Sequence, residues 1–95
     1  MIDWTDRTPQ NVGEVWTRRS GDETAVYHGD SLHILNASAL AIWELCDGAT
    51  HAGEMAQAIA EVTGLDVASA EIDVRRALDD LYSGGLITID EGGEE

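Results

Sequence analysis

Residues 31–48 read SLHILNASALAIWELCDG and decide the fold of this chain. Residues 31–35 predict a short apolar strand. Asn36 follows as a good helix cap, because its side chain can accept a hydrogen bond from a backbone N–H two or three positions on. Apolar side chains then recur at helical spacing, which predicts a first helix over residues 37–46 that ends before Gly48. The chain therefore changes from strands to helices at this point.

Two further strands are predicted before this change. Residues 12–18 alternate weakly between the two sides of a strand, and residues 23–28 are rich in side chains that favour strands. Glycine-containing turns at residues 20–22 and 29–30 separate the strands, since glycine accepts a positive φ. Together with residues 31–35, they predict a three-stranded antiparallel meander.

Two further helices are predicted after the first. Thr50 is the expected cap of the second helix, which Gly64 ends, and Asp66 or Ser69 is the expected cap of the third. The third helix ends at residues 84–85. Strands gathered before helices indicate an α+β domain of the winged-helix kind, in which a three-stranded antiparallel sheet is followed by three helices and a short C-terminal extended piece.

The apolar pattern also predicts the core. We expect Trp16 and Trp43 to be core aromatic residues, and Met55, Ile59 and Val62 to form the buried stripe of the second helix. The stripe expected on the third helix consists of Ala70, Val74, Ala77, Leu78 and Leu81.

The chain is long enough for one domain. Its 95 residues are 43% hydrophobic, which supports a modest core without disulfides or a metal. We expect residues 1–11 to be a flexible lead-in with room for Trp4 to dock, residues 12–89 to form the domain, and residues 90–95 to be a disordered acidic tail. No apolar run approaches the roughly 20 residues of a membrane span, and no signal sequence opens the chain. We therefore expect a cytoplasmic protein without a membrane partner.

The charge of the chain excludes some partners. Nineteen acidic residues against five arginines give a formal net charge of -14, so the protein repels nucleic-acid phosphates and anionic membranes. Arg75 and Arg76 on the third helix are a local exception.

No set of side chains predicts catalysis or a cofactor. His28, His33 and His51 have no carboxylate or thiol at metal-ligand spacing, and Cys46 has no histidine nearby in sequence. Cys46 fits a buried thiol better than a nucleophile. We therefore expect no catalytic residue, no metal and no cofactor.

The strand at residues 31–35 has two interpretations from the residues alone. Edge strands are usually protected by lysine, proline or a cover, and this strand contains neither lysine nor proline. It is either an open edge that could receive another chain, or a strand that is central or covered by the third helix.

A family resemblance bears on this choice. The residues that carry it are, in chain order, His33-Ile34-Leu35-Asn36, Ala39, Ile42-Trp43, Cys46-Asp47-Gly48, Asp73-Val74, Leu78, Leu81 and Gly85-Leu86-Ile87. Over residues 12–89, the chain resembles the PqqD-like family, also called the RiPP recognition element, where RiPP denotes a ribosomally synthesised and post-translationally modified peptide. It looks most like stand-alone members found beside lasso-peptide or kinase-related gene sets.

The resemblance implies a function without catalysis. Members bind the leader segment of a precursor peptide as an added strand beside the third strand and the third helix, and present it to a modifying enzyme such as a radical SAM protein or a leader peptidase. In this chain, the added strand would lie along Ser31, Leu32, His33, Ile34 and Leu35.

Residues on the third helix complete the expected site. Ile72 points almost opposite to the apolar arc of that helix, so it is either an incidental exposed residue or part of the binding strip. With Arg75, Arg76 and Asp79, it would receive an apolar anchor and an acidic neighbour of the peptide. The negative charge of the chain would otherwise disfavour an acidic leader.

Other functions stay open from the sequence. An acidic winged-helix adaptor that binds a protein partner is the alternative, and DNA binding through the third helix is disfavoured by charge. An open strand edge could also pair or swap with a second copy of the chain.

Overall fold

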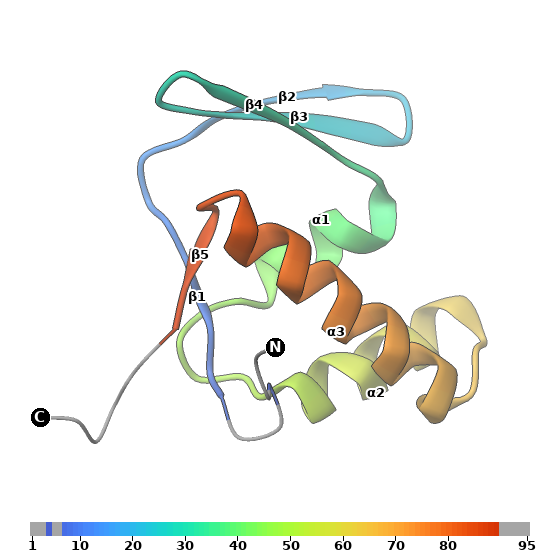
Figure 1. The fold of residues 1–95 in the computed structure, drawn as a ribbon. Coiled ribbons are helices and arrows are strands. Elements are labelled where there is room, and N and C mark those ends of the chain that lie inside the picture. Colours follow the sequence, from blue (N-terminus) through green and yellow to red (C-terminus); the bar gives the residue numbers. More distant parts are fainter. Residues whose placement is uncertain (1–3, 5–6, 90–95) are drawn as a thin grey trace, which may run out of the picture.

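The computed structural model describes residue 4 and residues 7–89 of the chain. Three strands, β2 (Trp16–Ser20), β3 (Glu23–His28) and β4 (Ser31–Leu35), form an antiparallel sheet in the order β2-β3-β4. This sheet lies at one end of the molecule, and the helices lie on one side of it (Figure 1). The predicted meander is therefore confirmed.

Three helices follow the sheet. They are α1 (Ala37–Glu44), α2 (Ala52–Thr63) and α3 (Val67–Ser83). The predicted cap of α1 is confirmed, because the Asn36 side chain accepts a hydrogen bond of 2.8 Å from the Ala39 N–H. The α+β class and the order of strands before helices are also confirmed.

The bounds of the first strand and the first helix differ from the predictions. β2 covers Trp16–Ser20 rather than residues 12–18, and α1 ends at Glu44 rather than at Cys46. Residue 12 belongs to a different interaction, since the Val12 N–H donates to the Leu86 carbonyl at 3.0 Å. The alternating pattern of residues 12–18 therefore spans two segments with different partners: residue 12 bonds to Leu86, and the segment from Trp16 pairs with β3.

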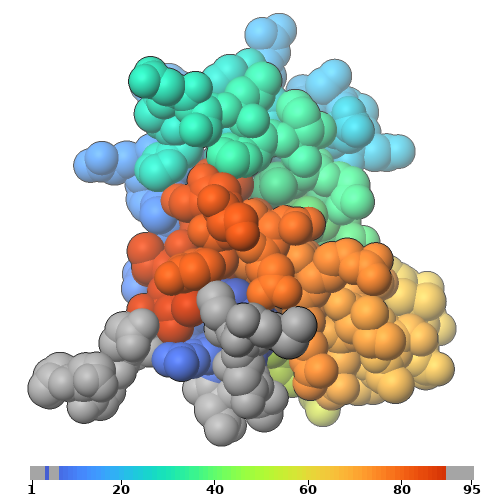
Figure 2. All heavy atoms as spheres, viewed as in Figure 1, coloured from blue at the N-terminus to red at the C-terminus, as the bar shows by residue number. Residues whose placement is uncertain are grey.

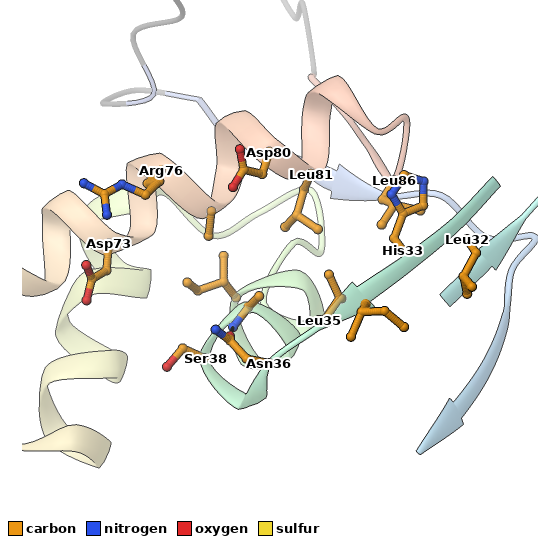
Figure 3. A pocket seen from close by; sticks show the side chains of 14 residues that line it. Leu32, His33, Leu35, Asn36, Ser38, Asp73, Arg76, Asp80, Leu81 and Leu86 are labelled. Carbon is orange, nitrogen blue, oxygen red and sulfur yellow. Dashed lines mark hydrogen bonds between the residues drawn. The ribbon is translucent and has the colours of Figure 1, made fainter. Parts of the chain in front are cut away.

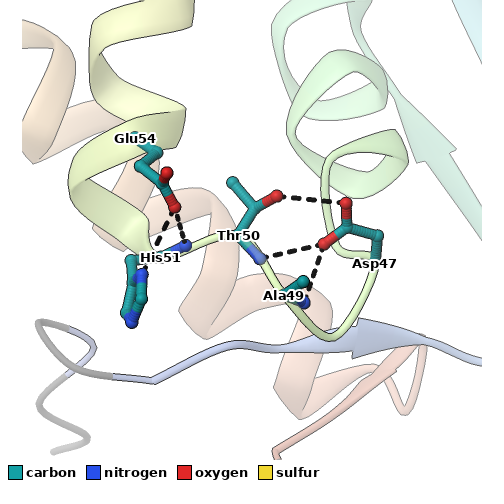
Figure 4. Close-up of polar contacts among 5 residues, drawn as sticks. All are labelled: Asp47, Ala49, Thr50, His51 and Glu54. Carbon is teal, nitrogen blue, oxygen red and sulfur yellow. Dashed lines mark hydrogen bonds and ion pairs between the residues drawn. The ribbon is translucent and has the colours of Figure 1, made fainter.

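The cap of α2 also differs from the prediction. His51 holds the cap position, and its N–H donates to Glu54 Oε1 at 2.8 Å. Thr50 is engaged one turn earlier, because its N–H donates to Asp47 Oδ1 at 2.9 Å and its hydroxyl donates to Asp47 Oδ2 at 3.1 Å (Figure 4). Hydrogen bonds from the backbone of Ala49 and from Thr50 lower the pKa of the Asp47 carboxyl. Thr50 is therefore part of a turn held together by Asp47, and it does not cap α2.

A second, smaller sheet joins the two ends of the described chain. β1 (Gln10–Asn11) pairs antiparallel with β5 (Ile87–Thr88). The Asn11 N–H also donates to the Cys46 carbonyl at 2.8 Å. The predicted C-terminal extended piece is confirmed as β5, and β1 is an element that the sequence did not predict.

Part of the predicted lead-in packs against the rest of the chain, as expected for Trp4. Trp4 is only 1% exposed, and its Nε1–H donates to Asp79 Oδ1 at 2.8 Å. Its ring also meets Tyr82 edge-on, with ring centroids 6.1 Å apart. Residues 1–3 and 5–6, like the predicted acidic tail at 90–95, lie outside the described residues.

The core lies mainly among the three helices and reaches the inner face of the sheet at Val26 and Leu35. Its largest fully buried side chains include Trp4, Ile42, Met55, Leu78 and Leu86. Trp43 is buried as predicted, and its Nε1–H donates to the Leu86 carbonyl at 3.0 Å.

Two predicted core residues are exposed instead. Trp16 is 81% exposed, because it belongs to the outer face of the sheet, which no other described element covers. Val62 is also exposed, although helical spacing places it on the same side as Met55 and Ile59, because it lies in the last turn of α2, where residues 61–69 are all exposed.

Trp4 is the most buried tryptophan and Trp16 the most exposed, so replacing each of them tests this packing. We expect Trp4→Ala to lower the free energy of unfolding by about 3–5 kcal/mol, because it removes a buried aromatic side chain. We expect Trp16→Ala to change it by only about 0.5 kcal/mol. Urea denaturation followed by circular dichroism would measure both, and equal effects of the two changes would contradict the packing of Trp4.

Candidate functional site

A groove of about 610 Å³ separates β4 from α3 (Figure 3). Its lining comes from three elements and two loop residues. These residues are Leu32, His33, Ile34 and Leu35 of β4; Asn36; Ser38, Ala39 and Ile42 of α1; Asp73, Arg76, Ala77, Asp80 and Leu81 of α3; and Leu86.

One wall of the groove is an open strand edge. β4 pairs with β3 on one side, and no strand among the described residues pairs with its other side. His28 and Ser31 are partners across a two-residue turn, so they form a hydrogen-bonded pair. In an antiparallel ladder such pairs alternate along the strand. The N–H and C=O groups of Leu32 and Ile34 therefore point to the open edge.

His33 closes one end of the groove against the end of α3. A Cβ placed on Gly84 would lie 2.7 Å from His33 Cε1, so any other residue there would force the ring or the backbone to shift. His33 Nε2 is buried and has no hydrogen-bond partner within the described part of the chain. The teal and green atoms of β4 meet the orange-red atoms at the end of α3 on the molecular surface (Figure 2). Gly84 therefore sets how closely α3 approaches the edge strand.

The groove has an apolar floor and a charged rim. Leu35, Ile42, Leu81 and Leu86 are buried side chains of the floor. Asp73, Arg76 and Asp80 are exposed on the α3 side. None of these rim charges makes an ion pair in the described residues, where the His51–Glu54 pair is the one present. The groove can therefore hold apolar side chains while its rim charges remain available.

The structure brings only part of the predicted site together. Four predicted residues of β4, from Leu32 to Leu35, line the groove with Arg76, and Ser31 begins the same strand. Ile72 and Arg75 are exposed but do not line the groove. Asp79 accepts the hydrogen bond from Trp4, on a different side of α3.

The α3 residues of the groove share a helical spacing, and only Arg76 among them was predicted for the site. Asp73, Arg76, Ala77 and Asp80 follow one another at intervals of three or four residues, which places them on one side of a helix. The same spacing was present in the sequence. Which side of α3 faces β4, however, follows from how the helix packs.

Cys46 does not fit a reactive thiol. It is fully buried, and its Sγ donates to the Ile42 carbonyl at 3.2 Å. Burial raises the pKa of the thiol to about 12, so Cys46 stays protonated near neutral pH.

Residues 4 and 7–89 contain no cluster of metal-ligand side chains. No three His, Cys, Asp or Glu side chains there gather as a metal ion would require. No helix of that part is long and apolar enough to cross a membrane.

The outer face of the sheet carries a second exposed surface. Trp16, Tyr27 and Leu32 are directly paired across the three strands, so they form one row on the same face. Ile34 lies in the next row of that face, beside the partners Ala25 and Arg18. Leu32 and Ile34 are 54% and 55% exposed. For brevity, we call the three residues of the first row, Trp16, Tyr27 and Leu32, together with Ile34 from the adjacent row, the outer-face row.

Comparisons with known proteins agree with this architecture. The sequence model of the PqqD family, described as coenzyme PQQ synthesis protein D, matches residues 23–87. A search of curated proteins found no match.

Two solved structures are similar in fold. TbiB1 in complex with the TbiA(beta) leader peptide has a TM-score of 0.68 and 24% identity, and the match covers 90% of this chain and 99% of that chain. The PqqD truncation of Methylobacterium extorquens PqqCD has a TM-score of 0.75 and 20% identity, and the match covers 93% of this chain and 95% of that chain. Its solution NMR structure is described as a functional, stand-alone RiPP recognition element.

Gly84→Ala tests the contact that closes the groove. The φ of Gly84 is -82°, which alanine adopts freely, so the expected cost comes from the collision with His33. We expect a loss of about 1–3 kcal/mol in the free energy of unfolding. Gly53→Ala is the control, because a Cβ there meets nothing within 4 Å.

A double-mutant cycle makes this test specific. Adding His33→Ala to Gly84→Ala should recover most of the loss, because the clash then has no partner. Additive losses from the two changes, measured by thermal denaturation, would show that the ring of His33 does not oppose Gly84.

Proposed function

Since the chain belongs to the PqqD family, we propose that its groove binds the leader segment of a ribosomally synthesised, post-translationally modified precursor peptide and catalyses no reaction on it. The observation that carries this proposal is the open edge of β4 beside an apolar groove. A polypeptide in extended conformation is the ligand that uses both features at once.

The leader would bind by adding a strand to the sheet. Its main chain would exchange hydrogen bonds with the outward-facing N–H and C=O groups of Leu32 and Ile34. Its side chains would alternate between the two faces of the extended sheet. Those that point toward the helices would enter the floor formed by Leu35, Ile42 and Leu81. Backbone pairing would then supply affinity, and the floor would supply selectivity.

The relatives support this mode of binding. TbiB1 has been solved with a leader peptide, and the Methylobacterium extorquens PqqD domain is described as a recognition element that functions alone. The match to the family covers β3, β4 and all three helices of this chain, and therefore every element that lines the groove.

We also propose that the outer-face row docks the enzyme that modifies the leader. Apolar side chains exposed together on one face are typical of protein interfaces, and tryptophan and tyrosine are enriched among the residues that dominate binding energy. Leu32 and Ile34 belong to both the row and the open edge. A bound leader would therefore extend the same face by one strand. The enzyme would be a radical SAM protein or a leader peptidase.

Two alternatives are weaker. An adaptor without a peptide ligand would use the outer-face row but would leave the groove without a role. DNA binding would require a basic surface, and the chain has a formal net charge of -14.

Ile34→Pro tests strand addition with little effect on the fold. The Ile34 N–H points to the open edge, so proline removes no hydrogen bond within the sheet, and edge strands tolerate proline at such positions. We expect the affinity for the leader of the precursor encoded beside this gene to fall about tenfold or more, while the melting temperature changes little. Isothermal titration calorimetry would measure the affinity.

Ile34→Ala is the control for this prediction, because it shortens the side chain and keeps the N–H. It should retain more affinity than the proline variant. Leader binding that is unchanged in Ile34→Pro would rule out pairing along β4.

Trp16→Ser tests the enzyme-docking face. We expect leader affinity to stay unchanged, since Trp16 lies on β2 and does not line the groove. The rate of leader processing by the enzyme encoded nearby should fall about 30-fold at limiting enzyme, as for the loss of a dominant interface residue. An unchanged rate would place the enzyme on another surface.

A further inference from the structure

The charges at the groove rim differ from those the sequence predicted. Arg75 and Arg76 were expected together at the site, but only Arg76 lines the groove. Asp73 and Asp80 line it as well, three residues before Arg76 and four residues after it. On a helix, both spacings make these carboxylates the immediate neighbours of the guanidinium.

The carboxylates outweigh the single arginine. None of the three rim charges is paired within 4 Å among the described residues, so each is open to solvent and to a ligand. Their sum is one negative charge, in a chain whose formal net charge is -14. An acidic peptide side chain that approached Arg76 would therefore meet repulsion from both neighbours and from the surrounding field.

The other polar groups of the groove do not reverse this sign. The Asn36 side-chain oxygen is occupied by the Ala39 N–H at 2.8 Å. His33 Nε2 is buried. Ser38 is neutral, although it lies in the first turn of α1, where the helix dipole weakly favours anions.

The rim lies beside the apolar floor of the groove. Asp73 and Asp80 are about two helical turns apart on α3, and Ala77 and Leu81 lie between or beside them and mark the apolar floor. Side chains on one face of a strand repeat about every 7 Å. A peptide with an apolar residue on the floor therefore points its next side chain on that face, two positions away, into the same groove, where a side chain as long as lysine or arginine can extend to the rim.

Building on the leader-binding function proposed above, we infer that the groove selects leaders in which a lysine or arginine stands two positions from an apolar anchor and faces Asp73 or Asp80. The apolar anchor fills the floor, and the basic side chain meets the rim. The groove thereby distinguishes its leader from acidic leaders.

Selection from a display library of random extended peptides tests this specificity. The baits are the wild-type protein, the double variant Asp73→Asn/Asp80→Asn, and the control Asp22→Asn/Glu61→Gln. The control removes the same charge from exposed positions outside the groove. We expect wild type and control to enrich lysine or arginine two positions from an apolar residue, and the groove variant to lose this enrichment. A selected basic peptide should bind the groove variant about fivefold more weakly at low salt.

The outcomes separate this inference from the proposed function. Selected peptides that bind wild type but not Ile34→Pro, and that show no basic enrichment, would overturn the charge selectivity and leave strand addition standing. Enrichment that persists in the groove variant would overturn it too. Peptides that bind Ile34→Pro as well as wild type would overturn both.

Discussion

The contact between His33 and Gly84 is the constraint on which the groove depends. It brings the C-terminal end of α3 against the edge strand, and the absence of a Cβ at Gly84 allows the close approach. Away from this contact, α3 runs toward α2 rather than along the sheet (Figure 1). Among the described residues, the outward backbone groups of Leu32 and Ile34 therefore have no strand partner, and an apolar floor lies beneath them. A vacant edge is normally a liability in a folded protein, so its position beside a groove favours a role in binding.

Three sides of α3 make different contacts. One side carries Val74 and Leu78 into the core, and another holds Trp4 through Asp79 and Tyr82. The third faces β4 across the groove. Because two sides are fixed by packing, the third can remain open without leaving the helix mobile. The small sheet of β1 and β5 fixes the chain on either side of this arrangement.

The exposed surfaces divide recognition into two parts. The groove offers backbone hydrogen bonds, a floor and a charged rim, which suits an extended peptide. The outer-face row offers flat apolar area without such directional groups, which suits a folded partner. Because Leu32 and Ile34 take part in both surfaces, binding of the leader would change the surface that the enzyme meets.

Local sequence signals determined much of this protein: the order of strands and helices, the cap at Asn36, the strand at residues 31–35 and the family, which the match to residues 23–87 confirms. These features depend on neighbouring residues, whose turn, capping and periodic preferences can be read directly. Tertiary structure alone decided the pairing of β1 with β5, the burial of Trp4, the exposure of Trp16, and the choice of Asp73 and Asp80 rather than Ile72 and Arg75 for the groove. Each of these depends on which face of an element meets a segment far away in the chain, and periodicity gives the faces of a helix or strand without saying what will cover them.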